Sequence, residues 1–470
     1  MPPPSPGGWG PPPPAAWGQP PPGAGWVPPP PRRRRPLVGI GLLLVATLVL
    51  VGGFGATVLR GHRLNPFASS DSAAADSDAQ FATDVHAALA ARTAALRTRN
   101  EAAFLADVDP DRPALVAQRR QLFRNLIQVP LVGAVFRDPV GWKRASDSAK
   151  LPGAKDFIVA LAHEVRSADL EPVSLGYEEQ WIRRNGRVVV TAATTQTVQN
   201  AFPGNPLDLV ALHLVSGPLV TVAAPAGVKD LPAIGAAAER AAADVRRLWG
   251  TRPGPGRFVV FVAPDTRSFR SWFSRTPRGE ALAGDAVGVT HQQYALASPT
   301  QAPRFGGSRI VIDRSRVQDP AQLTIVLRHE FTHAIDLGVR VQAPAASSPG
   351  YPVWVEEGFA AWSEEADVPL ARSRRLAGLR AHARRGYRPT TLPPDDGPAF
   401  YAGSTDMTDT NYESAASVFR YVAERWGRPK AIAMYTHLAS GTGDAAAAVL
   451  GQSWDAFVAG WQAWLQPRLT

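Results

Sequence analysis

The sequence predicts an α+β protein in which one membrane-spanning helix precedes two folded domains. Three observations support this prediction: an uncharged apolar run at 37–59, a change from helical to strand periodicity within 81–225, and a strand-then-helix order across 226–470. Helices followed by a run of antiparallel strands are typical of the α+β class. A chain of 470 residues is long enough for about two or three domains.

The first 36 residues cannot form a hydrophobic core. They hold sixteen of the 45 prolines, three tryptophans and no acidic residue. This composition is typical of disordered, partly polyproline II chain. We expect residues 1–36 to form a disordered cytoplasmic tail, and the alternative is that the spaced tryptophans contact a partner protein.

Residues 37–59 predict a transmembrane helix. These 23 residues carry no charge, and at about 1.5 Å per residue they span about 35 Å, enough to cross a hydrocarbon core of about 30 Å. Four arginines at 32–35 precede the run and favour a cytoplasmic N-terminus. The alternative is a cleaved signal peptide, but its apolar region is only about 7–15 residues long.

The expected protein is therefore anchored once in the plasma membrane, with its folded domains outside the cytoplasm. Residues 60–80 are small and polar at their end and predict a linker.

The domain expected at 81–225 combines helices with a strand meander. Apolar residues recur at helical spacing from Phe81, and a second helix follows Pro113. Tight turns such as Asn185-Gly186 separate four expected strands at 156–165, 173–182, 187–197 and 207–223. This pattern resembles a nuclear-transport-factor-like (cystatin-like) roll. The resemblance implies helices packed on a curved sheet, with a ligand-binding cone or a plain packing and spacer role as the two alternatives.

The second expected domain covers 226–470. Its pattern predicts an Ala-rich helix followed by two strands, then a helix with a polar motif and a mostly helical remainder. The corresponding ranges are 231–249, 257–263, 308–313 and 321–337, with later helices at 411–426 and 454–465.

His329, Glu330 and His333 form an HExxH motif on the expected helix 321–337. Residues four apart lie on one helix face, so the two imidazoles converge and can bind Zn²⁺ at about 2.0–2.1 Å. Glu330 lies beside them, where it can deprotonate a metal-bound water. The alternative is a surface helix that happens to carry two histidines.

The segment WVEEGFA at 354–360 offers a third ligand. A catalytic zinc takes three protein ligands and a water. Together, HEFTH and WVEEGFA resemble the gluzincin metallopeptidases, and 226–470 is similar to their small membrane-associated, peptidase MA-like members. The resemblance implies that Glu357, directly before the glycine, is the third ligand, with Glu356 as the alternative. It also implies that the strand 308–313 is an edge strand that binds an extended substrate.

The same resemblance implies a side chain that stabilises the oxyanion. Tyr412 is the candidate, and Tyr401 and Tyr421 are alternatives. Thermolysin-like enzymes also place an Asp four residues after the ligand Glu to hold a ligand His, but this chain has Ala361 there. Asp336 or Asp313 is expected to hold the imidazole instead. His291 is expected in a loop near the cleft.

Composition excludes other kinds of site. The chain has no Cys, so a catalytic metal must be held by His and carboxylate groups. The net charge of +10 leaves about +5 outside the first 60 residues, too little to indicate nucleic-acid binding. No serine-hydrolase elbow or phosphate-binding glycine loop is present.

The expected function is zinc-dependent hydrolysis of peptide bonds in a peptide or protein substrate outside the membrane. The alternative is a non-catalytic binding or scaffold protein of the cell envelope that keeps the zincin fold.

Overall fold

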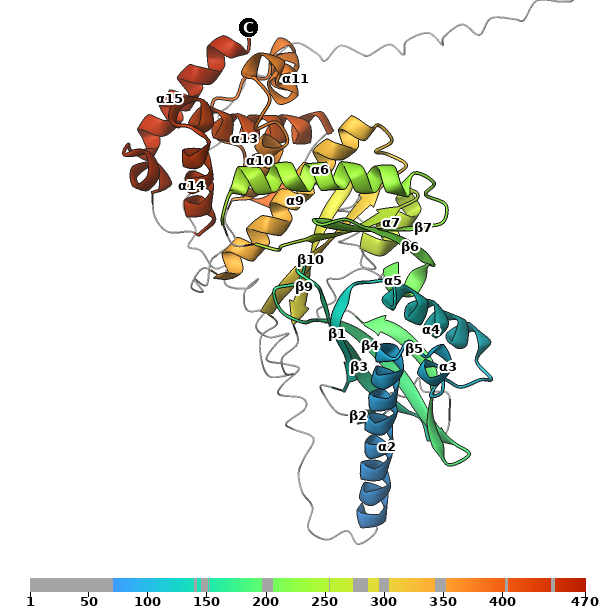
Figure 1. Ribbon diagram of the computed structural model, residues 1–470. Helices are drawn as coiled ribbons and strands as arrows, with labels where there is room; N and C mark the ends of the chain where they lie inside the picture. The colour runs from blue at the N-terminus through green and yellow to red at the C-terminus, as the bar shows by residue number, and fades with distance from the viewer. Residues whose placement is uncertain are drawn as a thin grey trace, which may run out of the picture. The chain divides into compact units, whose positions relative to one another are not determined.

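The computed structural model describes most of the chain from residue 71 to 470 (Figure 1). The gaps are at 139–141, 145–150, 152, 197–205, 253, 274–285, 296–303, 343–351, 402–404 and 441–443. The expected tail 1–36 and transmembrane segment 37–59 lie outside the described residues. Among the helices that are described, none has the length and hydropathy needed to cross a membrane.

The first helix, α2 (Asp71–Arg97), begins earlier than expected. Its first ten residues belong to the stretch 60–80 that the sequence predicts as a linker, so this part of the prediction is wrong. Alanine is the best helix former, and several alanines in this polar stretch explain the difference. The predicted apolar face is confirmed, because Phe81, Val85 and Leu89 are buried.

Helices and an antiparallel sheet form the first folded part. After α2 come α3 (Glu101–Phe104) and α4 (Pro113–Leu126). The sheet has the order β1-β3-β4-β5, and β2 pairs with the end of β3. Its strands are β1 (Leu131–Arg137), β2 (Trp142–Arg144), β3 (Lys155–Val165), β4 (Val173–Arg184) and β5 (Arg187–Gln196). The helices and β3–β5 match the prediction, whereas β1 and β2 were missed.

The second sheet has the order β6-β7-β8-β10-β9. Its central strands β7, β8 and β10 are parallel, and β6 and β9 flank them antiparallel. The strands are β6 (Leu212–Ser216), β7 (Val220–Pro225), β8 (Phe258–Ala263), β9 (Gly288–Ala295) and β10 (Arg304–Asp313). Two expectations are therefore corrected.

The first correction concerns the domain boundary. The hairpin β6–β7 was assigned to the domain 81–225, but it belongs to the second sheet, so the boundary lies between α5 (Pro206–Leu209), which packs on α4, and β6. The almost wholly buried β7 is typical of a central parallel strand. The second correction concerns the edge: the strand at 308–313 is internal, and among the described strands β9, which pairs with it, and β6 lie at the two edges.

Helices cover the second sheet and form the rest of the chain (Figure 1). α6 (Leu231–Trp249) packs on α9 (Pro320–Gln342) and on β7, while α10 (Val353–Ser363) packs on α13 (Thr405–Trp426). An aromatic cluster around Phe359 joins these layers, because its ring contacts those of Trp249, Phe419 and Tyr435. The remaining helices are α7 (Thr266–Phe273), α11 (Arg374–Arg384), α12 (Gly397–Phe400), α14 (Arg428–Ala439) and α15 (Trp454–Leu465).

A buried ion pair joins the two sheets. Asp169, in the β3–β4 turn, accepts two hydrogen bonds from Arg309 on β10, at 2.6 and 2.9 Å. Leu170 N–H donates to Gly306 O at 2.7 Å. The approach is so close that a Cβ on Gly307 would lie 2.2 Å from the Asp169 carboxylate. The first domain is therefore part of the same compact unit as the second, not a tethered spacer.

A second buried network lies inside the first domain. Glu179 on β4 is fully buried and accepts hydrogen bonds from Arg92 at 2.8 Å and from Arg119. Burial opposes ionisation, but the two guanidinium groups outweigh it and hold the pKa of Glu179 below its usual range. Removing one member of such a network leaves a buried charge without its partner.

We therefore expect Glu179→Gln to destabilise the protein by about 3–5 kcal/mol, because the buried Arg119 loses its ion pair and Arg92 keeps only the one with Asp107. Chemical denaturation followed by circular dichroism measures the change. The matched control is Asp111→Asn, which breaks an ion pair to Arg184 on a carboxylate that is 76% exposed. Equal midpoints for the two variants would show that the network contributes nothing.

Candidate metal centre

The helix α9 carries the HExxH motif, as predicted. Asp319 precedes it and accepts a hydrogen bond from Gln322 N–H at 2.9 Å, and Pro320 begins the helix. Leu323, Leu327 and Phe331 are buried along one face. The helix does not end near Gly338, as the sequence indicated, but runs to Gln342. Gly338 instead lies where α9 comes close to Gly254.

His329, His333 and Glu357 meet in a tight triangle. The His329 and His333 Nε2 atoms are 3.0 Å apart, and Glu357 Oε2 lies 3.2 Å from the first and 3.5 Å from the second. Ligands at about 2.0–2.1 Å from a tetrahedral zinc are separated by about 3.3 Å. The three side chains are only 12–14% exposed. This group can therefore hold a metal ion.

Glu356, the alternative ligand, lies on the other side of the His333 ring. Its Oε1 is 3.6 Å from His333 Nδ1, whereas the triangle uses the Nε2 atoms. The geometry therefore favours Glu357 over Glu356 as the third donor.

Two contacts hold Glu357 in place. Its neighbour Gly358 packs directly against Ala415 on α13, where a Cβ would lie 2.6 Å from the Ala415 Cβ. This glycine lets α10 approach α13 closely enough to bring Glu357 to the imidazoles. On the other side, Tyr401 O–H donates to Glu357 Oε1. The remaining oxygen, Oε2, therefore faces both imidazoles.

Glu364 holds the His329 ring. His329 Nδ1–H donates to Glu364 Oε1 at 2.9 Å, which leaves the lone pair of Nε2 for the metal. The sequence predicted Asp313 or Asp336 in this role. Asp313 does not have it, because it accepts hydrogen bonds from Thr266 and Ser315 instead. Asp336 is buried one turn beyond His333.

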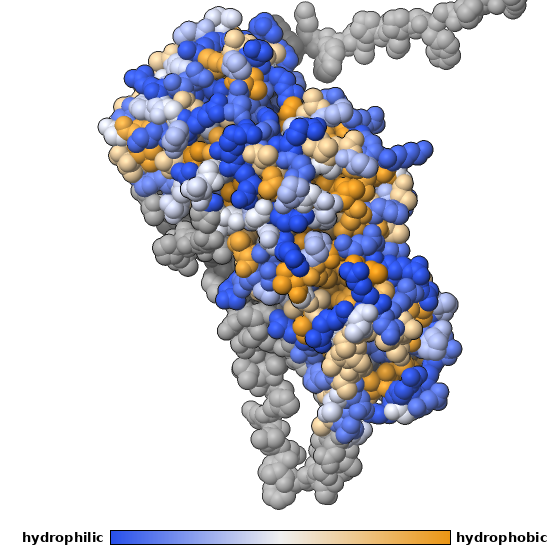
Figure 2. All heavy atoms as spheres, in the orientation of Figure 1, coloured by the Kyte–Doolittle hydropathy of each residue, from blue (hydrophilic) through white to orange (hydrophobic). Residues whose placement is uncertain are grey.

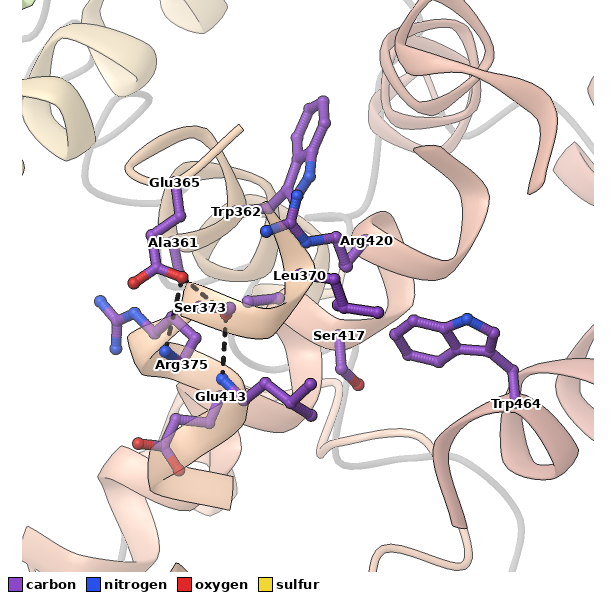
Figure 3. Close-up of a pocket in the computed structure, with 12 residues that line it drawn as sticks. Ala361, Trp362, Glu365, Leu370, Ser373, Arg375, Glu413, Ser417, Arg420 and Trp464 are labelled. Atoms are coloured by element: carbon purple, nitrogen blue, oxygen red, sulfur yellow. Dashed lines mark hydrogen bonds between the residues drawn. The ribbon is translucent and has the colours of Figure 1, made fainter. Parts of the chain in front are cut away.

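Arg375 holds Glu364 in turn, by hydrogen bonds of 2.6, 2.8 and 3.1 Å. Its position depends on the start of α11. Figure 3 shows this region beside a small pocket lined by residues of α10, α11 and α13. There Ser373 caps the helix and donates to Glu365 Oε2 at 2.7 Å, and Arg374 N–H donates to Glu365 Oε1 at 2.9 Å. The pocket itself is small, about 20 Å³, which is room for about one water molecule. The residues around this pocket therefore serve to position Arg375.

The electrostatics of the triangle favour a positive charge between its members. Burial opposes protonation of His329, but Glu357 and Glu364 outweigh it and raise the pKa of His329 to about 10. The pKa of His333 is raised in the same way by Glu357. Despite burial, the two imidazoles hold the pKa of Glu357 well below its usual range. Protons and a metal ion therefore compete for the same two nitrogens.

Glu330 lies beside the triangle and contacts the edge strand. Thr290 Oγ1–H on β9 donates to Glu330 Oε2 at 2.8 Å. Burial raises the pKa of Glu330, although the nearby imidazoles oppose the shift. A Cβ on Gly288 would lie 2.9 Å from Glu330 Oε1, so this glycine makes room for the carboxyl group. A carboxyl with a raised pKa is suited to proton transfer near neutral pH.

The sequence did not predict the contributions of Thr290 and Gly288. Their segment was expected to be a loop, but it forms β9, and His291 in this strand pairs with Arg309 on β10. Burial lowers the pKa of His291 to about 4. The polar run THQQY does not show the apolar pattern by which strands are recognised. An edge strand such as β9 can form without that pattern, because it has no need for a continuous apolar face.

The three candidate tyrosines occupy different places. The Tyr412 ring lies 6.0 Å from the His329 ring, and burial raises the pKa of Tyr412 well above its usual range, so its hydroxyl stays protonated. Tyr401 contacts Glu357 and its ring lies 6.4 Å from that of Tyr412. Tyr421 instead packs against Trp426 and Phe457, so it has a structural role.

Comparison with known protein families and with curated proteins finds no match for this chain. The chemistry of the site is therefore inferred from its own residues.

Replacing Glu364 tests the support of His329. We expect Glu364→Gln to weaken zinc binding by about 10–100-fold, because the ring loses the carboxylate that orients it. Competition with a chelator of known affinity measures the change. Glu424→Gln is the control, since this carboxylate is 41% exposed and makes a 3.9 Å ion pair with Arg420 on the same helix. Unchanged zinc affinity in Glu364→Gln would refute the orienting role.

Proposed function

We propose that the protein is a zinc-dependent metallopeptidase of the gluzincin type. The observation that carries the proposal is the donor triangle of His329, His333 and Glu357, with the Glu330 carboxyl next to it. Two imidazoles and one carboxylate are a standard ligand set for a catalytic zinc that keeps one position open. A chain without Cys has no thiolate set to offer instead.

When bound, zinc would act as a Lewis acid that activates water and polarises the scissile carbonyl. Glu330 takes the proton of the attacking water and passes it to the leaving amine. Thr290 fixes the orientation of the Glu330 carboxyl through the 2.8 Å hydrogen bond from β9. Burial raises the pKa of Glu330, which makes its carboxylate a stronger proton acceptor.

Tyr412 supplies a hydrogen-bond donor for the developing oxyanion in this proposal. Its raised pKa keeps the hydroxyl protonated, the hydroxyl hydrogen-bonds that of Tyr401, and the ring lies 6.0 Å from the His329 ring. Tyr401 has a different role, because its hydroxyl already donates to the outer oxygen of Glu357.

The proposed location and membrane topology rest on the sequence. Residues 37–59 anchor the protein in the plasma membrane, the N-terminus is cytoplasmic, and the peptidase acts on polypeptides outside the cytoplasm. The uncharged run and the four arginines at 32–35 support this topology. We also propose that the first domain is a nuclear-transport-factor-like roll, and its helices beside an antiparallel sheet support this.

Two substitutions separate metal binding from proton transfer. We expect Glu330→Gln to keep bound zinc and to lower casein hydrolysis by about 10²–10⁴-fold, because the proton acceptor is lost. His329→Ala is expected to lose both the bound zinc and the hydrolysis of casein. Elemental analysis and a casein assay measure both properties. Full activity in Glu330→Gln would refute the mechanism, and a zinc-loaded wild-type protein that hydrolyses no peptide would favour the scaffold alternative.

The two site tyrosines are expected to differ. Tyr412→Phe should lower kcat by about 10²-fold without changing zinc affinity, because one oxyanion donor is removed. Tyr401→Phe should weaken zinc binding, because Glu357 loses the contact that orients it. Steady-state kinetics and chelator competition on both variants test this assignment. The opposite pattern would exchange the two roles.

A further inference from the structure

A groove lies where the first domain meets the end of the edge strand β9. It has a volume of about 440 Å³, within the range of about 300–1,000 Å³ that is usual for ligand sites. Figure 1 shows β1 close to β9 at this junction. The groove is lined by β1, β3, the residues after the β3–β4 turn, and the two strand ends at Ala295 and Arg304.

The floor of the groove is apolar. Side chains alternate across a strand, and in β1 the core-facing Ala134 and Phe136 are buried, so Gly133 and Val135 face outwards. Val132 and Val135 are 56% and 49% exposed, which is unusual for branched apolar residues of a strand. Ala162, Pro172 and Ala295 extend this floor. Figure 2 shows hydrophobic side chains gathered on the face where β1 and β9 lie.

The rim of the groove carries charges of both signs. Arg137 and Arg304 line the groove together with Glu164 and Glu171, and Arg304 pairs with Glu171 at 2.6 Å. A balanced rim does not select a strongly charged ligand such as a nucleic acid or a phosphate group. It suits a polypeptide, whose backbone is neutral and polar.

The edge strand β9 links the groove to the proposed active site. Thr290 on β9 contacts Glu330, and Ala295, five residues further along the same strand, lines the groove. At about 3.3 Å per residue the two points are about 17 Å apart. No other described strand pairs with the outer edge of β9, and β1 is likewise the last strand of its sheet. The edge of β9 therefore runs from the residue that contacts Glu330 to the groove, and β1 lies on the other side of that groove.

We infer that this groove binds an extended apolar stretch of the polypeptide substrate, about five residues from the scissile bond. The inference rests on the proposed function and adds a substrate class to it: unfolded or extended chain with aliphatic side chains at this distance. The buried Asp169–Arg309 ion pair joins the β3–β4 turn to β10, the strand that pairs with β9, so the two sides of the groove are held together before a ligand binds.

A large side chain introduced at Gly133 would fill the groove. A Cβ at this position would have no atom within 4 Å, and its backbone is not in the left-handed region, so a large side chain fits without strain. Gly227, in the turn between β7 and α6, has the same two properties and lies outside the groove. Gly133→Tyr and Gly227→Tyr therefore form a matched pair.

The test uses the full-length protein and two synthetic peptides built on the casein bond that it cuts fastest. One peptide carries about three residues on each side of the bond and cannot reach the groove, and the other carries about ten. The measured quantity is the ratio of kcat/KM for the long peptide to that for the short one. We expect this ratio to fall by about 10-fold in Gly133→Tyr, because a Val-sized side chain loses its binding surface, and to stay unchanged in Gly227→Tyr.

An equal ratio in wild type and Gly133→Tyr would overturn the subsite. It would leave the proposed function intact, because both peptides are still cleaved. If the wild-type protein cleaves neither peptide, binding of the fluorescein-labelled long peptide to the same proteins is measured by fluorescence anisotropy. Binding that Gly133→Tyr abolishes and Gly227→Tyr keeps would support the groove although the peptidase proposal fails. Absence of binding in the wild type would overturn it.

Discussion

Three acceptor atoms lie within 3.0–3.5 Å of one another at the centre of the second domain. The lone pairs of two imidazole Nε2 atoms and a carboxylate oxygen repel one another unless a cation or protons lie between them. The surrounding structure holds them there from several sides. Gly358 lets α10 pack on α13, Tyr401 holds the outer oxygen of Glu357, and Arg375 holds Glu364 against His329.

The first domain takes part in this arrangement through the edge strand. Glu330 is oriented by Thr290 on β9, and β9 pairs only with β10 among the described strands. The beginning of β10 is fixed by the Asp169–Arg309 pair and by the close contact at Gly307. A domain that the sequence alone leaves as a packing unit therefore supports the strand beside Glu330. The same junction forms the groove that we assign to the substrate.

Much of the site could be predicted from the sequence, because local spacing decides it. The i, i+4 spacing on α9 brings His329 and His333 together, and the glycine after Glu357 points to the helix contact that positions it. Glu364 was missed, although it lies seven residues after Glu357 and hence two turns further along the same helix face. Its role depends on Arg375 from another helix, and no local pattern reveals that contact.

The arrangement of the strands was less predictable, because long-range pairing decides it. The hairpin β6–β7 follows β5 in the chain but pairs with β8, so chain order gave the wrong domain boundary. β9 was missed since its polar side chains lack strand periodicity, and β1 was missed since its outward face is the apolar groove.

X-ray absorption spectroscopy of zinc in the purified protein tests the central claim most directly. The expected result is one zinc per chain with two imidazole nitrogens and oxygen ligands at about 2.0–2.1 Å, whereas a zinc shell without imidazole, or no stoichiometric zinc, would contradict it.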